Sequence, residues 1–151
     1  MTEIKLTFPE SVSAKLMDGE LVLELAKPTI VLGKGINNVQ LTKNFNLSEF
    51  ESDNNVVKVS TELVLGLQIM RNLIGRPIKV INGYRTPEHN KRVGGADNSQ
   101  HLHGRAADIT VEGMSGKELA KFAEVAGFNA IGIAKTAIHV DDRPERVRWN
   151  Y

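Results

Sequence analysis

Two short segments with alternating side chains place the strongest constraint on the fold. They read Ala-Ala-Asp-Ile-Thr-Val over residues 106–111 and Ala-Ile-His-Val-Asp over residues 137–141. Successive side chains of a β-strand point to opposite faces of a sheet. The side chains of Asp108 and Ile109 therefore point to different faces, and so do those of His139 and Val140. Each segment therefore predicts a strand with one apolar face for a core and one polar face that presents possible ligands.

The rest of the main body predicts helices and strands in alternation. Further strands are expected at 77–81 and 130–134, and residues 60–75 and 115–127 carry apolar side chains at the spacing of one helical face. The expected inward positions are Leu63, Leu67, Met70 and Leu73 (with Ile74), then Leu119, Phe122 and Val125 (or Ala126). This order predicts an α+β fold, a small antiparallel sheet with flanking helices and a metal site on the sheet face.

The first part of the chain has a different pattern. Residues 1–43 contain short alternating stretches that predict a β-rich arm or accessory segment. The main domain is expected over residues 44–151, starting with a short helical turn capped by Ser48.

Composition limits the classes of partner. The chain of 151 residues has 19 basic and 18 acidic side chains, so no nucleic-acid partner is predicted. No run approaches the roughly 20 apolar residues of a membrane span, and the N-terminus lacks the pattern of a signal peptide. Because cysteine is absent, any metal must be held by histidine and carboxylate.

Two histidines and one aspartate meet these requirements for a metal. His101 precedes the strand that carries Asp108, and His139 lies on the other strand with its side chain on the polar face. Two imidazoles and a carboxylate suit zinc and leave a fourth position for water. From the residues alone, hydrogen-bonded structural roles stay an alternative for all three.

Three ordered motifs over residues 44–149 closely resemble the M15 family of zinc D-Ala-D-Ala peptidases, in particular its short carboxypeptidase-like branch. The central pattern Ser-x-His-x-x-Gly-x-Ala-x-Asp is met over residues 99–108, and an upstream Gly-Tyr-Arg-Thr-Pro element lies at residues 83–87, with Asn90 after it. The downstream element contains Gly132, His139, Asp141, Arg143 and Trp149, with Ala130 in place of its first glycine. The first 43 residues lie outside the resemblance.

The resemblance implies roles for individual residues. His101, Asp108 and His139 would hold one Zn²⁺, and Arg85 would contact the substrate or a developing oxyanion. Ser99 and His103 are expected to contact the substrate, although Ser99 could instead cap a backbone amide and His103 could be an exposed bystander.

The general base is less determined. Some relatives place an acidic residue three positions before the last ligand histidine, where this chain has Thr136. Asp141 lies on the same strand face as His139 and is the expected base, in a catalytic role shared with Arg85. The alternative is that Asp141 orients Arg143 or a ligand histidine.

The implied function is zinc-dependent hydrolysis of a peptide bond in a peptidoglycan stem peptide. D-Ala-D-Ala carboxypeptidase or endopeptidase activity is the first expectation, and L-Ala-D-Glu endopeptidase activity is an alternative. A non-catalytic zinc-containing module that binds the cell wall or builds a virion is another. A protein made in the cytoplasm without a signal peptide would reach the wall after release or on a phage particle, with the N-terminal arm as a possible attachment element.

Overall fold

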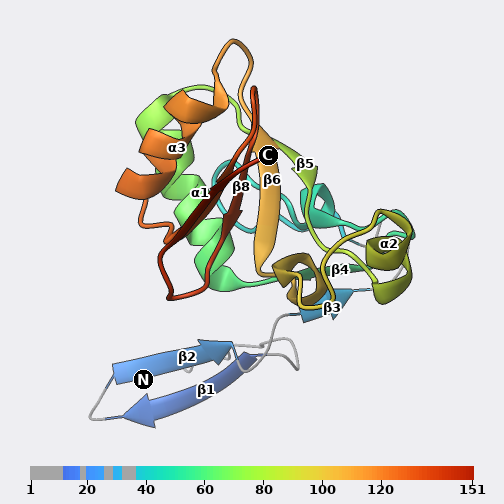
Figure 1. Ribbon diagram of the computed structural model, residues 1–151. Helices are drawn as coiled ribbons and strands as arrows, with labels where there is room; N and C mark the ends of the chain where they lie inside the picture. Colours follow the sequence, from blue (N-terminus) through green and yellow to red (C-terminus); the bar gives the residue numbers. More distant parts are fainter. Residues whose placement is uncertain (1–11, 18–19, 26–28, 32–36) are drawn as a thin grey trace.

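The computed structural model describes residues 12–17, 20–25, 29–31 and 37–151 (Figure 1). The strands are β1 (Val12–Met17), β2 (Glu20–Leu25), β3 (Thr29–Val31), β4 (Val57–Val59), β5 (Lys79–Asn82), β6 (Ala106–Thr110), β7 (Ala130–Ile133), β8 (Ile138–Asp141) and β9 (Val147–Asn150). The helices are α1 (Thr61–Ile74), α2 (Pro87–Arg92) and α3 (Gly116–Val125), with 3₁₀ turns η1 (Leu47–Phe50) and η2 (Gln100–His103). None of the helices in these ranges is long and apolar enough to cross a membrane.

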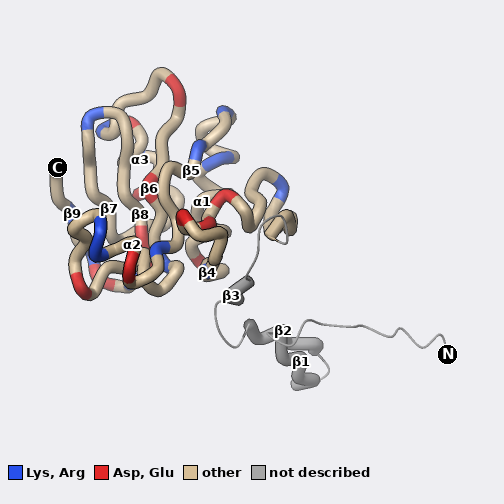
Figure 2. Tube along the Cα trace, turned by 90° about the vertical axis from the view of Figure 1, so that its right-hand side faces the viewer, with Lys and Arg blue, Asp and Glu red and all other residues tan. Residues whose placement is uncertain are grey.

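A five-stranded sheet forms the centre of the main body, in the order β5-β6-β8-β7-β9 (Figure 2). The first four strands pair antiparallel, which confirms the predicted α+β class. The prediction lacked β9, which pairs parallel with β7 and makes the sheet mixed. The sequence of β9, Val-Arg-Trp-Asn, does alternate apolar and polar residues, so a strand signal of the minimum length was present and was passed over.

Helices α1 and α3 pack against each other and cover one face of this sheet (Figure 1). The apolar strand positions predicted for the core are buried there, including Ile109 on β6 and Ile138 and Val140 on β8. Leu67 of α1 and Leu119 of α3 complete the contact, each with no exposed surface. The opposite face of the sheet is thereby left for polar side chains.

Both long helices begin at residues that satisfy free backbone amides. Ser60 accepts a hydrogen bond from the Leu63 amide at the start of α1, and Ser115 and Glu118 form a reciprocal capping box at the start of α3. Helix α1 ends at Gly75, which adopts the left-handed conformation, φ +72°, that glycine accepts without strain.

Two predicted core positions are wrong. Leu73 is 46% exposed, because the buried stripe of α1 continues from Met70 to Ile74, one full turn later. Val125 is 72% exposed, and the alternative Ala126 packs against the core. The first short helical turn also begins earlier than expected, since Asn46 rather than Ser48 caps η1.

The start of the chain contributes β-structure, as predicted for the N-terminal segment. Strands β1 and β2 form an antiparallel hairpin, and β3 pairs antiparallel with β4 of the main body. The predicted division between residues 43 and 44 stays a prediction, although the β3–β4 pairing crosses it. The expectations for residues 1–11, 18–19, 26–28 and 32–36 lie outside the described residues.

Candidate metal centre

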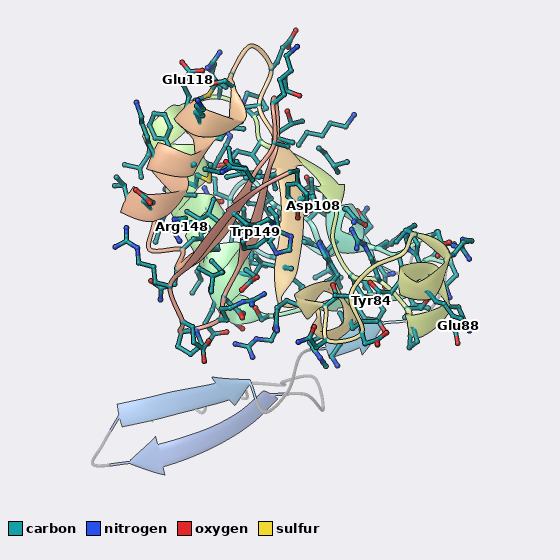
Figure 3. The ribbon with its side chains drawn as sticks, viewed as in Figure 1. Tyr84, Glu88, Asp108, Glu118, Arg148 and Trp149 are labelled. Atoms are coloured by element: carbon teal, nitrogen blue, oxygen red, sulfur yellow. The ribbon has the colours of Figure 1, made fainter. Side chains whose placement is uncertain are left out.

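The site lies on the sheet face opposite the helices, where one row of residues crosses the strands. Asn82 pairs with Asp108, Asp108 with His139, His139 with Gly132, and Gly132 with Trp149. Facing residues on adjacent strands are about 4.5–5.5 Å apart, so the row concentrates polar and aromatic groups at one level of the sheet. Figure 3 labels Asp108 and Trp149 in this central region, whereas Glu118 lies at the start of α3.

His101 reaches the row from η2, just before β6. The backbone amide of Arg85 donates to the His101 carbonyl at 3.0 Å, and the Ser60 amide donates to the Gly104 carbonyl at 2.8 Å. Gly104 has φ +65°, and a Cβ there would collide with the carbonyl group of Lys58, 2.5 Å from its carbon. Gly104 therefore permits a sharp turn and a close approach of two backbone segments.

The three predicted ligands come together as a compact triangle of donor atoms. His101 Nε2 lies 3.2 Å from His139 Nδ1 and 3.3 Å from one oxygen of Asp108, and His139 Nδ1 lies 2.9 Å from the same oxygen. Tetrahedral zinc with bonds of about 2.0–2.1 Å separates its ligands by about 3.3 Å. The residues therefore fit one zinc ion with an open fourth position.

The outer nitrogens of both histidines also support a metal site. His101 Nδ1 lies 2.6 Å from the carbonyl oxygen of Gly83, and His139 Nε2 lies 3.1 Å from Asp141 Oδ2. An acceptor at the outer nitrogen calls for a proton there, which leaves the lone pair of the inner nitrogen for a metal.

Asp108 is held by two donors that point at its second oxygen. Asn82 Nδ2 donates at 3.0 Å and Arg85 Nη2 at 3.1 Å, both to Oδ2, so Oδ1 is the oxygen within the triangle. Burial by itself would raise the pKa of Asp108, but hydrogen bonds with His101 and His139 outweigh it and hold that pKa well below its usual range. The carboxylate is therefore charged and ready to bind a cation. Asn82 was not among the predicted site residues, because its place beside Asp108 follows from the pairing of β5 with β6.

Hydrogen bonds also outweigh burial in setting the pKa values of His139 and Asp141. Burial would lower the pKa of His139, but its hydrogen bonds to Asp108 and Asp141 raise it above the usual value. Burial would raise the pKa of Asp141, yet bonds from His139 and Arg143 lower it to about 2. Two carboxylates thus flank one imidazole.

A cavity of about 760 Å³ opens over the triangle. Arg85 and Ser99, both predicted to meet substrate, line it together with the three candidate ligands. Ser99 is the residue before η2 and makes no side-chain capping bond. His103 is exposed and is not among the lining residues, so its placement matches the bystander alternative rather than substrate contact.

Trp149 forms an aromatic wall beside the triangle. Its ring centroid lies 5.2 Å from that of His139, at an interplanar angle of 52°, and Tyr151 meets it edge-on at 6.1 Å. The indole packs on Gly132, where a Cβ would lie 2.6 Å from its Nε1. Gly132 therefore makes room for Trp149 next to the candidate ligand His139.

The predicted general base does not face the cavity. Asp141 is fully buried, contacts the outer nitrogen of His139, and is not among the lining residues. Thr136, at the position acidic in some relatives, is exposed, and its carbonyl oxygen accepts a bond from Thr110 Oγ1. Among the described residues, Asp108 is the one carboxylate that lines the cavity. This placement favours the alternative expectation for Asp141, that it orients a ligand histidine.

Comparisons with known proteins agree with this geometry. The sequence model of the family described as Peptidase M15 matches residues 38–141, which include all three candidate ligands. The chain is also similar to the zinc D-Ala-D-Ala carboxypeptidase of Streptomyces albus G, with 42% identity over 66 residues. That match covers 43% of this chain and 26% of the relative, so the chain spans about a quarter of the relative's length.

Proposed function

Because the chain belongs to the peptidase M15 family, we propose that it hydrolyses a peptide bond in bacterial peptidoglycan by means of one zinc ion. The observation that carries the proposal is the triangle of His101, Asp108 and His139 at the base of a cavity large enough for a peptide. When bound, zinc would polarise the scissile carbonyl and activate a water molecule for attack.

The protein's own side chains would orient the substrate around this centre. Arg85 lies at the cavity with Nη2 bonded to Asp108, so its guanidinium is fixed beside the place where an oxyanion would develop. Ser99 lies on the cavity wall with its hydroxyl not engaged in capping, which suits a hydrogen bond to a peptide group.

The cavity suits the anionic end of a stem peptide with small side chains. Among the described residues, the charged side chains that line it are Arg85, Arg143 and Asp108. The two candidate ligand histidines line it as well. Ala96, Ala134 and Ala137 supply small apolar surface. Together with the name of the Streptomyces albus G relative, these features support a D-Ala-D-Ala bond as the first substrate to test, by carboxypeptidase or endopeptidase action.

A second function is favoured by one specific observation. No carboxylate apart from the candidate ligand Asp108 lines the cavity among the described residues, so a dedicated base is missing there. A zinc-containing module that binds the cell wall without cleaving it would have no need of that base. Delivery on a phage particle through the N-terminal arm stays a prediction.

One experiment separates these functions. The zinc-loaded protein is incubated with synthetic stem peptides that end in D-Ala-D-Ala, with the same peptides amidated at the C-terminus, and with purified sacculi. Mass spectrometry identifies the products, with a chelator-treated sample and His139→Ala as controls.

Chelator-sensitive loss of one D-Ala from the free peptide is the expected result. Cleavage of the amidated peptide or of cross-linked sacculi would indicate an endopeptidase, and cleavage between L-Ala and D-Glu would change the bond assigned. No cleavage by a protein with stoichiometric zinc, combined with its retention on sacculi, would contradict the peptidase proposal in favour of the binding module.

A further inference from the structure

Asp141 occupies a position behind the candidate metal site rather than within it. Its side chain has no exposed surface, and Oδ2 lies 3.1 Å from His139 Nε2, the ring nitrogen that is not part of the donor triangle. Arg143 donates from Nε to Oδ1 and from Nη2 to Oδ2, both at 2.7 Å, and from its backbone amide to Oδ1 at 3.2 Å. Among the residues that the structure describes, every hydrogen bond and ion pair of this carboxylate is therefore with His139 or Arg143.

This arrangement accounts for a charge that would otherwise be costly to bury. A buried carboxylate without partners is strongly destabilising, whereas a bidentate guanidinium and an imidazole N–H satisfy its acceptors. Arg143 is itself partly exposed at the cavity wall, so the network runs from solvent through Arg143 and Asp141 to His139.

We propose that Asp141 and Arg143 are positioning residues that fix the orientation and tautomer of His139. Asp141 accepts a hydrogen bond from the Nε2–H group, so the lone pair of Nδ1 points toward the metal, and Arg143 holds the Asp141 carboxylate in the plane that this bond requires. The inference rests on the metal site and is independent of which bond the protein cleaves, or whether it cleaves one.

The two ligand histidines differ in how they are held. His101 uses a neutral backbone carbonyl, that of Gly83, at 2.6 Å. The outer nitrogen of His139 instead donates to the charged carboxylate of Asp141. This charge also increases the basicity of the imidazole and hence its strength as a ligand. A substitution of Asp141 can thus test how His139 is held while leaving the contact of His101 unchanged.

The test measures zinc affinity, by competition with a chromophoric chelator, in Asp141→Ala, Asp141→Asn, Arg143→Ala and Arg143→Lys. Removal of a residue that orients a ligand costs about 10- to 100-fold in metal affinity, which is the loss expected for Asp141→Ala. Asp141→Asn keeps an acceptor for Nε2 without the charge, so its loss is smaller. Arg143→Lys should retain more affinity than Arg143→Ala.

Asp142 provides a matched control. It is the adjacent carboxylate, its side chain is 6% exposed, and it is bonded to Arg105 and Ser60 rather than to a candidate ligand. Asp142→Asn is expected to lower the stability of the fold while leaving the zinc dissociation constant unchanged. Arg146→Ala, at a side chain that is 75% exposed, is the control for Arg143.

A second readout distinguishes positioning from general stability. Long-range ¹⁵N–¹H spectra of the zinc-loaded wild type should show an Nε2 proton on His139 that is shifted downfield by its hydrogen bond to Asp141, and this shift should be lost in Asp141→Ala. Wild-type zinc affinity and an unchanged Nε2 proton shift in Asp141→Ala, or an equal loss of affinity in Asp142→Asn, would overturn the inference. If Asp141→Ala does not fold, Asp141→Asn and Arg143→Ala decide by the same two measurements. Absence of peptide cleavage would leave this result unaffected.

Discussion

Replacement of Gly132 by alanine tests whether the close packing of Trp149 beside His139 is as tight as the structure indicates. Gly132 has an ordinary strand conformation, so alanine adds no backbone strain. The added methyl group would lie 2.6 Å from both Nε1 and Cζ2 of Trp149, which is far inside van der Waals contact. The indole must move, and His139, whose ring centroid is 5.2 Å away, loses its aromatic neighbour.

The size of the effect follows from two opposing contributions. Overpacking of a fitted site costs about 1–3 kcal/mol, and exchange of glycine for alanine within a strand contributes about 0.5–1 kcal/mol in the other direction. We expect Gly132→Ala to lower the free energy of unfolding by about 1–2 kcal/mol. In a Trp149→Ala background the space is open, so the same change should be neutral or stabilising by up to about 1 kcal/mol.

A double-mutant cycle measures the difference directly. Urea unfolding followed by circular dichroism gives the free energy of unfolding for the wild type, both single variants and the double variant. A coupling energy of about 1–3 kcal/mol is expected between the two positions. An equal effect of Gly132→Ala in both backgrounds would refute the packing argument, because the methyl group would then meet no ring.

Three further changes address the core, a turn and a helix cap. Leu67→Ala, at a fully buried side chain, should lower the free energy of unfolding by about 2–5 kcal/mol in the same urea assay, and a loss below 1 kcal/mol would contradict its place in the core. Gly104→Ala should cost more than Gly94→Ala, because both positions have positive φ but a Cβ meets the Lys58 carbonyl only at Gly104; equal losses would argue against the close approach. The pKa of Glu118 is lowered by hydrogen bonds from the backbone and side chain of Ser115, so the charged form adds stability above the ordinary pKa of a glutamate, and this stability is lost as the pH falls through the lowered value. Glu118→Gln should therefore be less stable than the wild type at pH 7 and approach it at acidic pH, and a difference that does not vary with pH would contradict the cap.

Side-chain alternation was enough to predict the face of the sheet that carries the site. The apolar positions Ile109, Ile138 and Val140 are buried, while Asp108 and His139 lie on the opposite face. This prediction works because one buried face leaves a strand a single acceptable register. The helices were predicted for the same reason, since 3.6-residue periodicity requires a core on one side.

What the sequence did not predict depends on contacts between distant segments. The bond from Asn82 to Asp108 arises from the pairing of β5 with β6, and no local pattern specifies that pairing. The face of the strand was predicted for Asp141, but which nitrogen of His139 it would meet depends on the orientation of the ring. Strand β9, with the wall that Trp149 forms, joins the sheet through a parallel pairing that the short final segment did not indicate.

A crystal structure of the zinc-loaded protein with anomalous scattering at the zinc edge tests the central claim most directly. We expect one zinc ion bonded to His101 Nε2, His139 Nδ1 and Asp108 at about 2.0–2.1 Å, with a fourth position open to the cavity. Zinc at another place, coordination through His139 Nε2, or a fourth protein ligand that closes the site would contradict the account.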